Sequence, residues 1–306
     1  MTAAALFALY AAAAGMLAPA LLRGSWAARS PRLAMTLWLV LPVSWVAAIV
    51  LAILAVTAPL PLTWPGSPRD GGRMLLPGQA VPGGRAIAIA GLLLAAAVVL
   101  RAAGCAVCEL RRGQRGWRAH SALIAATGHP GDEPDVAIVD HDAPALYCLP
   151  RGPRKIVISA SALAALTPGQ FRAVLAHERT HLRRHHHLML TLATSLARAF
   201  PRVPLLTQAQ PQLAELAELA ADDAAIRRHQ RDDLAAALVV LATAGARPAT
   251  LAASGPEAMA RLQRILATQQ PRTGLSRLAA IGALIPPVVI ACLPLFLAAC
   301  DISSHS

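Results

Sequence analysis

Apolar residues gather in four long stretches that are separated by segments rich in charged and turn-forming residues. The stretches cover residues 2–22, most of 34–59, a run that begins after Arg85, and 278–300. A helix needs about 20 apolar residues to cross the ~30 Å hydrocarbon layer of a bilayer. The pattern therefore predicts four transmembrane helices.

The third and fourth stretches each depart from a simple span. The third is short unless its helix continues past Arg101, whose long side chain can reach the polar interface. The fourth contains Pro286 and Pro287, and we expect a kink there because proline interrupts the helical hydrogen bonds. Residues 301–306 would then form a short external tail.

Between the third and fourth stretches, the spacing of hydrophobic residues becomes first strand-like and then helical. The runs "DVAIVD" (135–140), "ALYCL" (145–149) and "KIVIS" (155–159) predict short strands bounded by turn residues. A helical pattern follows in a long segment from residue 168, and again at 212–230 and 232–245. An α+β domain is therefore expected between the third and fourth spans.

Composition supports a membrane protein. Hydrophobic residues make up 56% of the 306 residues and charged residues only 14%, with a mean hydropathy of +0.52. This excess of apolar surface needs a second apolar solvent, which the bilayer supplies. We expect a predominantly α membrane protein. Its regions are a membrane part with three spans (1–101), the α+β domain (102–277), the fourth span (278–300) and the tail (301–306).

The net charge of +12 does not indicate a nucleic-acid-binding protein. The arginines are scattered and flank apolar runs, and only two tyrosines and four phenylalanines are available for stacking on bases. Arginines follow the first and third stretches and precede the fourth, whereas no basic residue follows the fourth. Because cytoplasmic loops are enriched in Lys and Arg, we expect a multi-pass protein of the plasma membrane whose 102–277 region is cytoplasmic.

Histidine is concentrated in "TPGQFRAVLAHERTHLRRHHH", residues 167–187. Thr167 with Gln170 predicts a capping box that starts a helix. On this helix His177 and His181 are four residues apart, so both face one side and can hold a single Zn²⁺. Glu178 lies beside that position, where it can act as the general base on a metal-bound water.

A catalytic zinc of this type needs a third protein ligand and one open position. In the metzincin pattern the third ligand is a histidine that follows a glycine turn, but Arg184 stands in place of the glycine. The run "QLAELAELAADDAA" (212–225) offers a glutamate instead. We favour Glu218, with Asp222 one turn later to orient a ligand imidazole. Glu215 is the competing ligand.

The neighbouring "HHH", residues 185–187, has no assigned role. His185 is a candidate for a contact with a metal ligand, and a solvated or membrane-facing helix face is the alternative that we favour. The helix from residue 168 is expected to continue through this stretch.

"HERTH" followed by "ELAADD", and preceded by "ALYCLPRGPRKIVISASALAALTPGQFRAVLA", resembles the gluzincin core of membrane metallopeptidases. With four predicted spans around it, the chain is similar to the BlaR/MecR-type antirepressor metallopeptidases over almost its whole length. The resemblance implies a zinc ion bound by His177, His181 and Glu218, with Glu178 as general base. It also implies that the strand region near 145–159 forms an edge on which an extended substrate adds a strand.

The resemblance further implies limited proteolysis of a cytoplasmic protein, a winged-helix repressor of the BlaI/MecI kind. The BlaR/MecR receptors carry a penicillin-binding sensor after the fourth span, whereas this sequence ends at "DISSHS", so we expect no β-lactam sensing through such a domain. Two alternatives remain open. One is a quality-control protease similar to the HtpX type, and the other is a non-catalytic signal transducer that contains zinc.

Overall fold

The computed structural model describes residues 3–57, 84–150, 155–244 and 258–267. The predicted fourth span and the tail lie outside these residues, as does most of the loop between the second and third spans. The described elements are listed in chain order: α1 (Ala3–Leu22), α2 (Ser25–Arg29), α3 (Pro31–Thr57), α4 (Gly84–Thr127), β1 (His129–Pro130), β2 (Val136–Val139), β3 (Leu146–Cys148), β4 (Ile156–Ser159), α5 (Ala160–Ala165), α6 (Pro168–Arg183), α7 (His186–Ala199), α8 (Pro204–Ala225) and α9 (Arg231–Ala244). A further helix covers 258–266.

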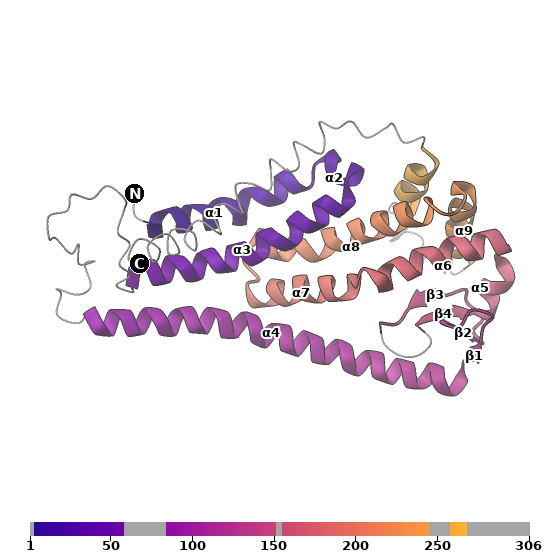
Figure 1. The fold of residues 1–306 in the computed structure, drawn as a ribbon, viewed down its shortest axis with the longest axis horizontal. Helices are drawn as coiled ribbons and strands as arrows, with labels where there is room; N and C mark the ends of the chain where they lie inside the picture. The colour runs from indigo at the N-terminus through magenta and orange to yellow at the C-terminus, as the bar shows by residue number, and fades with distance from the viewer. Residues whose placement is uncertain (1–2, 58–83, 151–154, 245–257, 268–306) are drawn as a thin grey trace, which may run out of the picture.

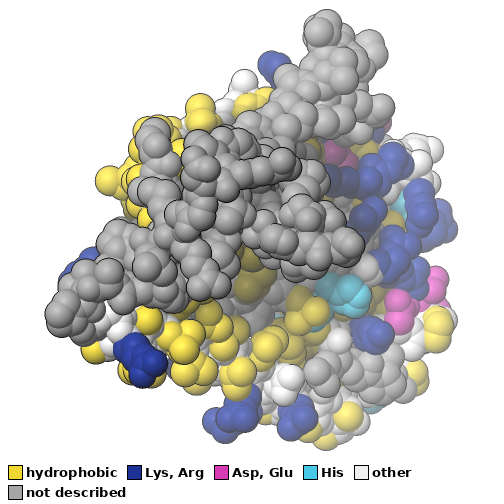
Figure 2. Space-filling view, turned by 60° about the vertical axis from the view of Figure 1, so that its left-hand side comes forward, with side chains coloured by type: hydrophobic (Ala, Val, Ile, Leu, Met, Phe, Trp, Pro, Cys, Tyr) yellow, Lys and Arg dark blue, Asp and Glu magenta, His cyan; other side chains and the backbone are white. Residues whose placement is uncertain are grey.

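Among the described residues, three helices are long and apolar enough to cross a membrane, namely α1, α3 and α4. They correspond to the first three predicted spans, and they run side by side in Figure 1. Many of their large apolar side chains face outward, for example Leu17 and Leu93, which are 62% and 64% exposed. In Figure 2 hydrophobic side chains gather in one region of the visible face and Lys and Arg side chains in another. Such an outward apolar surface suits contact with lipid.

Helix α4 is much longer than a membrane span. Its 44 residues correspond to about 66 Å at 1.5 Å per residue, roughly twice the thickness of the hydrocarbon layer. The helix therefore continues past Arg101, as the short third apolar run required. The Arg101 Nε donates a hydrogen bond to the Ala199 carbonyl oxygen at 2.6 Å, which ties α4 to the end of α7.

Helices α7 and α8 form an antiparallel hairpin that packs against the membrane helices (Figure 1). One hydrophobic cluster contains Leu22 of α1, Trp38 of α3, Met189 of α7 and Leu213 of α8. Trp38 is completely buried in it. The apolar faces of the hairpin and of the first two spans therefore share one core, so the hairpin and these spans support each other.

The small sheet lies at one end of the molecule beside the end of α4 (Figure 1). Its strand order is β1-β2-β4-β3, with β2 and β4 parallel and the other neighbours antiparallel. The "KIVIS" strand, β4, is buried along its whole length and paired on both sides. Within the predicted 145–159 edge region, only β3 therefore lies at an edge of the described sheet, and the expectation that "KIVIS" takes part is wrong.

The long helix predicted from residue 168 is in fact two helices. Helix α6 ends at Arg183, and α7 begins at His186 after His185, which has φ 51° and ψ 39°. This left-handed conformation is uncommon for a residue with a side chain and cannot continue a right-handed helix. The regular helix therefore ends shortly after the HERTH motif, and of the three "HHH" residues His186 is buried whereas His185 is exposed.

Candidate metal centre

The helix that carries the HERTH motif begins as the sequence predicts. The Thr167 backbone N–H donates to Gln170 Oε1 at 3.0 Å, and the Gln170 N–H donates to Thr167 Oγ1 at 3.3 Å. This reciprocal capping box satisfies two backbone donors that a helix end otherwise leaves unpaired. Closer to the C-terminal end of α6, the Arg179 guanidinium pairs with Asp135, directly before β2, at 2.6 and 2.9 Å. This contact fixes the helix against the sheet.

The two HERTH histidines and Glu218 converge on one point. The Nε2 atoms of His177 and His181 are 3.1 Å apart. Each Nε2 lies 3.4 Å from one carboxylate oxygen of Glu218, which reaches the point from α8. All three potential ligand atoms lie within 4.8 Å of one another. Glu215 is exposed and is not part of this cluster, so the geometry favours Glu218 of the two glutamates.

The cluster fits a zinc ion. Two imidazole nitrogens and one carboxylate oxygen are a donor set that zinc takes in catalytic sites, with one position left for water or substrate. Burial lowers the pKa of His177, but Asp222 and Glu218 outweigh this and bring it to about 9. Burial lowers the pKa of His181 to about 4. In the metal-free chain His177 therefore carries an extra proton near neutral pH, which a bound metal ion has to displace.

Asp222 lies behind His177, at the position expected for a group that orients a ligand. Its Oδ1 is 2.9 Å from His177 Nδ1, on the side of the ring opposite the cluster. The N–H direction is not well aligned for a hydrogen bond, so the contact is chiefly electrostatic. Asp222 is completely buried. A carboxylate at this place favours the tautomer of His177 that leaves Nε2 free to bind a metal.

Glu178 and Cys148 of β3 face each other beside the cluster. Burial and the Glu178 carboxylate raise the pKa of the Cys148 thiol to about 12. Burial also raises the pKa of Glu178. A carboxylate with a raised pKa is a stronger base than an exposed glutamate, which suits a group that takes a proton from water near neutral pH.

His186, rather than His185, contacts the cluster. Its Nδ1 lies 3.1 Å from Nδ1 of His181, and its side chain is buried. His186 therefore stands behind His181 much as Asp222 stands behind His177. Sequence reasoning named His185 as a candidate contact but favoured an exposed helix face, and His185 is exposed; the residue it missed is His186, which follows the left-handed His185 and is buried.

A second residue that sequence reasoning missed is Arg261, on the 258–266 helix. Its guanidinium contacts Glu218 and Asp222 together. It lies 39 residues beyond Asp222 along the chain, and no local pattern marks it. The sequence contains one indication of such a residue. Two carboxylates that are withdrawn from water on one helix face are costly unless a cation lies nearby.

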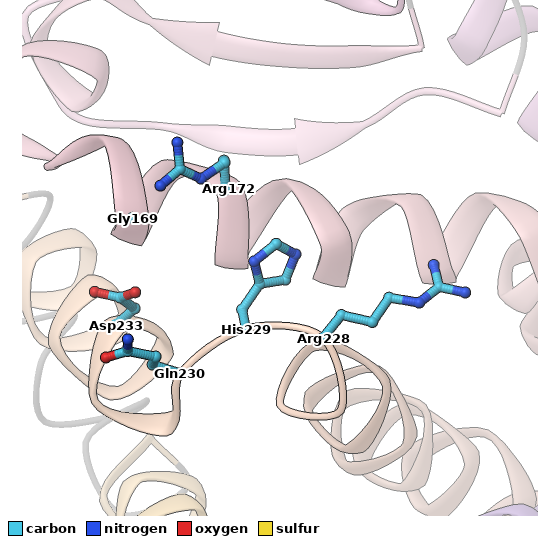
Figure 3. A pocket seen from close by; sticks show the side chains of 6 residues that line it. All are labelled: Gly169, Arg172, Arg228, His229, Gln230 and Asp233. Carbon is cyan, nitrogen blue, oxygen red and sulfur yellow. The ribbon is translucent and has the colours of Figure 1, made fainter.

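One open cleft among the described residues lies apart from the metal cluster. It has a volume of about 330 Å³ and is lined by Gly169, Arg172, Arg228, His229, Gln230 and Asp233 (Figure 3). These residues surround the start of α6 and include none of the three potential ligands. The chemistry of the cluster thus does not depend on this cleft.

The comparisons with known proteins agree with the geometry of the cluster. No solved structure matches the chain significantly. The family model described as BlaR1 peptidase M56 matches residues 86–267, which is more than half of the chain and contains His177, His181 and Glu218. The resemblance drawn from the HERTH and ELAADD motifs is thereby confirmed, and the chain belongs to the BlaR1 peptidase M56 family.

Proposed function

We propose that this chain is a multi-pass membrane zinc endopeptidase that cleaves a cytoplasmic protein at a limited number of sites. The observation that carries the proposal is the convergence of His177, His181 and Glu218 within 4.8 Å, with Glu178 next to the first histidine. Membership of a peptidase family and three helices able to span a membrane support it.

The residues of the cluster have separate tasks. His177, His181 and Glu218 would hold the zinc ion, which when bound polarises a carbonyl group and lowers the pKa of water. Glu178 accepts the proton from the attacking water and delivers it to the leaving amine. Cys148 of β3 and Glu178 interact closely enough to affect each other's pKa, so the Glu178 carboxylate lies beside β3. The base and the strand that would receive a peptide therefore meet at one place.

Strand β3 is an edge strand of the described sheet, where an extended substrate could pair with it. Ala145 O accepts and Leu149 N donates a backbone hydrogen bond on the β4 side, at 2.9 and 2.6 Å. In an antiparallel pair such bonds alternate, so the N–H groups of Leu146 and Cys148 point away from β4. Within the described sheet these groups have no neighbouring strand. A peptide that pairs with β3 would lie beside Glu178.

Leu146→Pro is expected to lower cleavage about 3- to 10-fold, because it removes one outward donor worth roughly one net hydrogen bond. Zinc content should not change, since β3 supplies no proposed ligand. The measurement is kcat/KM on one peptide, with Leu146→Ala as the control for the lost side chain. Equal losses in both variants would show that the backbone donor does not bind substrate. Proline at Val157, in the interior strand, should instead disrupt the sheet itself.

The arginine pattern supports a cytoplasmic location of the peptidase region. Reporter fusions at positions 70 and 250 are expected to lie on opposite sides of the membrane, because an odd number of proposed spans separates them. Activity of a reporter that works only outside the cytoplasm, measured for both fusions, checks this. Both fusions on one side would contradict the proposed arrangement.

The proposed substrate is a winged-helix repressor of the BlaI/MecI kind. The test compares cytoplasmic proteins of cells that contain the wild-type chain with those of cells that contain Glu178→Gln. One repressor that appears as a matched pair of fragments, only with the wild type, supports the proposal. Turnover of many unfolded membrane proteins would instead indicate an HtpX-like quality-control protease. A chain that binds zinc and yields no fragments would indicate a non-catalytic transducer.

A further inference from the structure

One arginine from outside the HERTH and ELAADD motifs contacts both Glu218 and Asp222. Arg261 Nε and Nη2 donate to the two oxygens of Asp222 at 2.9 and 2.8 Å. Its remaining nitrogen, Nη1, lies 2.8 Å from Glu218 Oε2. The planar guanidinium therefore uses all three of its nitrogens on two carboxylates one helical turn apart on α8.

These contacts connect Arg261 with two of the three potential ligands. Glu218 is held directly, through the same oxygen that lies 3.4 Å from His177 Nε2. His177 is reached through Asp222, whose Oδ1 lies close both to Arg261 Nη2 and to His177 Nδ1. A rigid fork that fixes Asp222 on one side and Glu218 on the other sets the direction of both carboxylates relative to the ring of His177.

The helix that carries Arg261 is attached to the rest of the molecule by other residues as well. Arg264 Nη2 lies 2.8 Å from Asp223 Oδ1 and donates to the Ala28 carbonyl oxygen at 3.1 Å. Arg231 of α9 donates to two carbonyl groups at the end of this helix. Ile265 is buried in the core beneath α6. Docking of the helix therefore does not require the contacts of Arg261 with the cluster.

Arg261 could affect metal binding in two opposite ways, through its charge or by orienting the ligands. A positive charge next to a cation site repels the metal ion, so a guanidinium that acted only as a charge would weaken metal binding. A guanidinium that orients the ligands strengthens it, because the carboxylate and imidazole are then held in place before the ion arrives. The bidentate contact with Asp222 neutralises much of the charge and favours the second effect.

We propose that Arg261 is a positioning residue of the metal centre, which strengthens Zn²⁺ binding by fixing Glu218 directly and His177 through Asp222. The inference rests on the proposed function only in assuming that the cluster binds zinc. It adds a residue from a separate helix to the groups that determine the affinity of the site.

The test measures the dissociation constant for Zn²⁺ by competition with a chromophoric chelator, using the full chain in detergent. Arg261→Gln is expected to bind Zn²⁺ about 10- to 100-fold more weakly than the wild type, as is typical when an outer partner of a ligand is removed. Arg261→Lys should recover only a small part of this loss, because one ammonium group cannot hold three carboxylate oxygens. Arg264→Gln, one turn along the same helix, is the matched control and should bind as the wild type does.

Three results would overturn the inference. Unchanged or tighter binding by Arg261→Gln would show that the residue does not position the ligands. An equal loss in Arg264→Gln would assign the effect to helix docking, and circular dichroism melting of both variants shows whether they fold alike. Full recovery in Arg261→Lys would show that charge is sufficient. A wild-type chain that binds no Zn²⁺ would instead contradict the proposed function itself.

Discussion

Glu178→Gln is expected to reduce proteolysis by about 10²- to 10⁴-fold while the zinc content stays near one ion per chain. The substitution keeps the shape of the side chain and both HERTH histidines, but an amide cannot accept the proton from water. The buried environment of Glu178 raises its pKa, so the carboxylate is matched to proton transfer near neutral pH. The measurement pairs kcat/KM on a cleaved peptide with metal analysis of the same preparation.

The pH dependence of proteolytic activity is a second test of the role of Glu178. A base works in its deprotonated form, so activity of the wild type should fall as the pH drops through the pKa of Glu178. Burial raises that pKa in the metal-free chain, whereas a bound zinc ion lowers it, so the midpoint of the decline measures the pKa of Glu178 in the loaded enzyme. Full proteolysis by Glu178→Gln would show that Glu178 is not the general base of the reaction, since loss of the base should lower turnover strongly.

The part of the site that lies on one helix could be predicted from the sequence. His177 and His181 share a face because residues four apart in a helix do so whatever the surroundings. The capping box of Thr167 and Gln170 also allowed the start of that helix to be predicted. Glu218 and Asp222 followed from the same rule on a second helix, although spacing alone could not exclude Glu215. Exposure of Glu215 in the folded chain favours Glu218.

The contact with His181 could not be predicted, because it depends on the backbone of His185. A left-handed residue that is not glycine is held by its tertiary surroundings rather than by its own preference. Once α6 ends there, His186 is directed into the core and reaches His181 at 3.1 Å. Arg261 is a similar case, since its partners lie on α8 and only the folding of distant segments brings them together.

Strand order was only partly visible in the sequence. Ile156, Val157 and Ile158 form an apolar run without alternation, which is typical of a strand buried on both faces. The structure agrees, because β4 lies between β2 and β3 and all three residues are buried. The apolar run therefore pointed to an interior strand, whereas its position before the HERTH helix suggested an edge. The apolar run predicted the interior position of β4 correctly, and the position before the HERTH helix did not.

Glu218→Gln is expected to remove both zinc and activity. A neutral amide replaces the one anionic ligand of the cluster, and two imidazoles remain, which is too few for a stable catalytic site. The loss of affinity should exceed the ~10- to 100-fold typical of an outer partner, because a direct ligand is lost. Metal analysis after dialysis against a weak chelator measures this, and the same sample is assayed for cleavage.

Glu215→Gln is the matched control for this experiment. Glu215 lies one turn earlier on α8 but is exposed and outside the cluster, so its substitution should leave zinc content and turnover unchanged. Zinc loss in Glu215→Gln together with retention in Glu218→Gln would shift the third ligand by one helical turn and leave the enzyme in place. Zinc retained in both variants would mean that neither glutamate completes the site. Only loss confined to Glu218→Gln agrees with a carboxylate that lies 3.4 Å from both imidazole nitrogens.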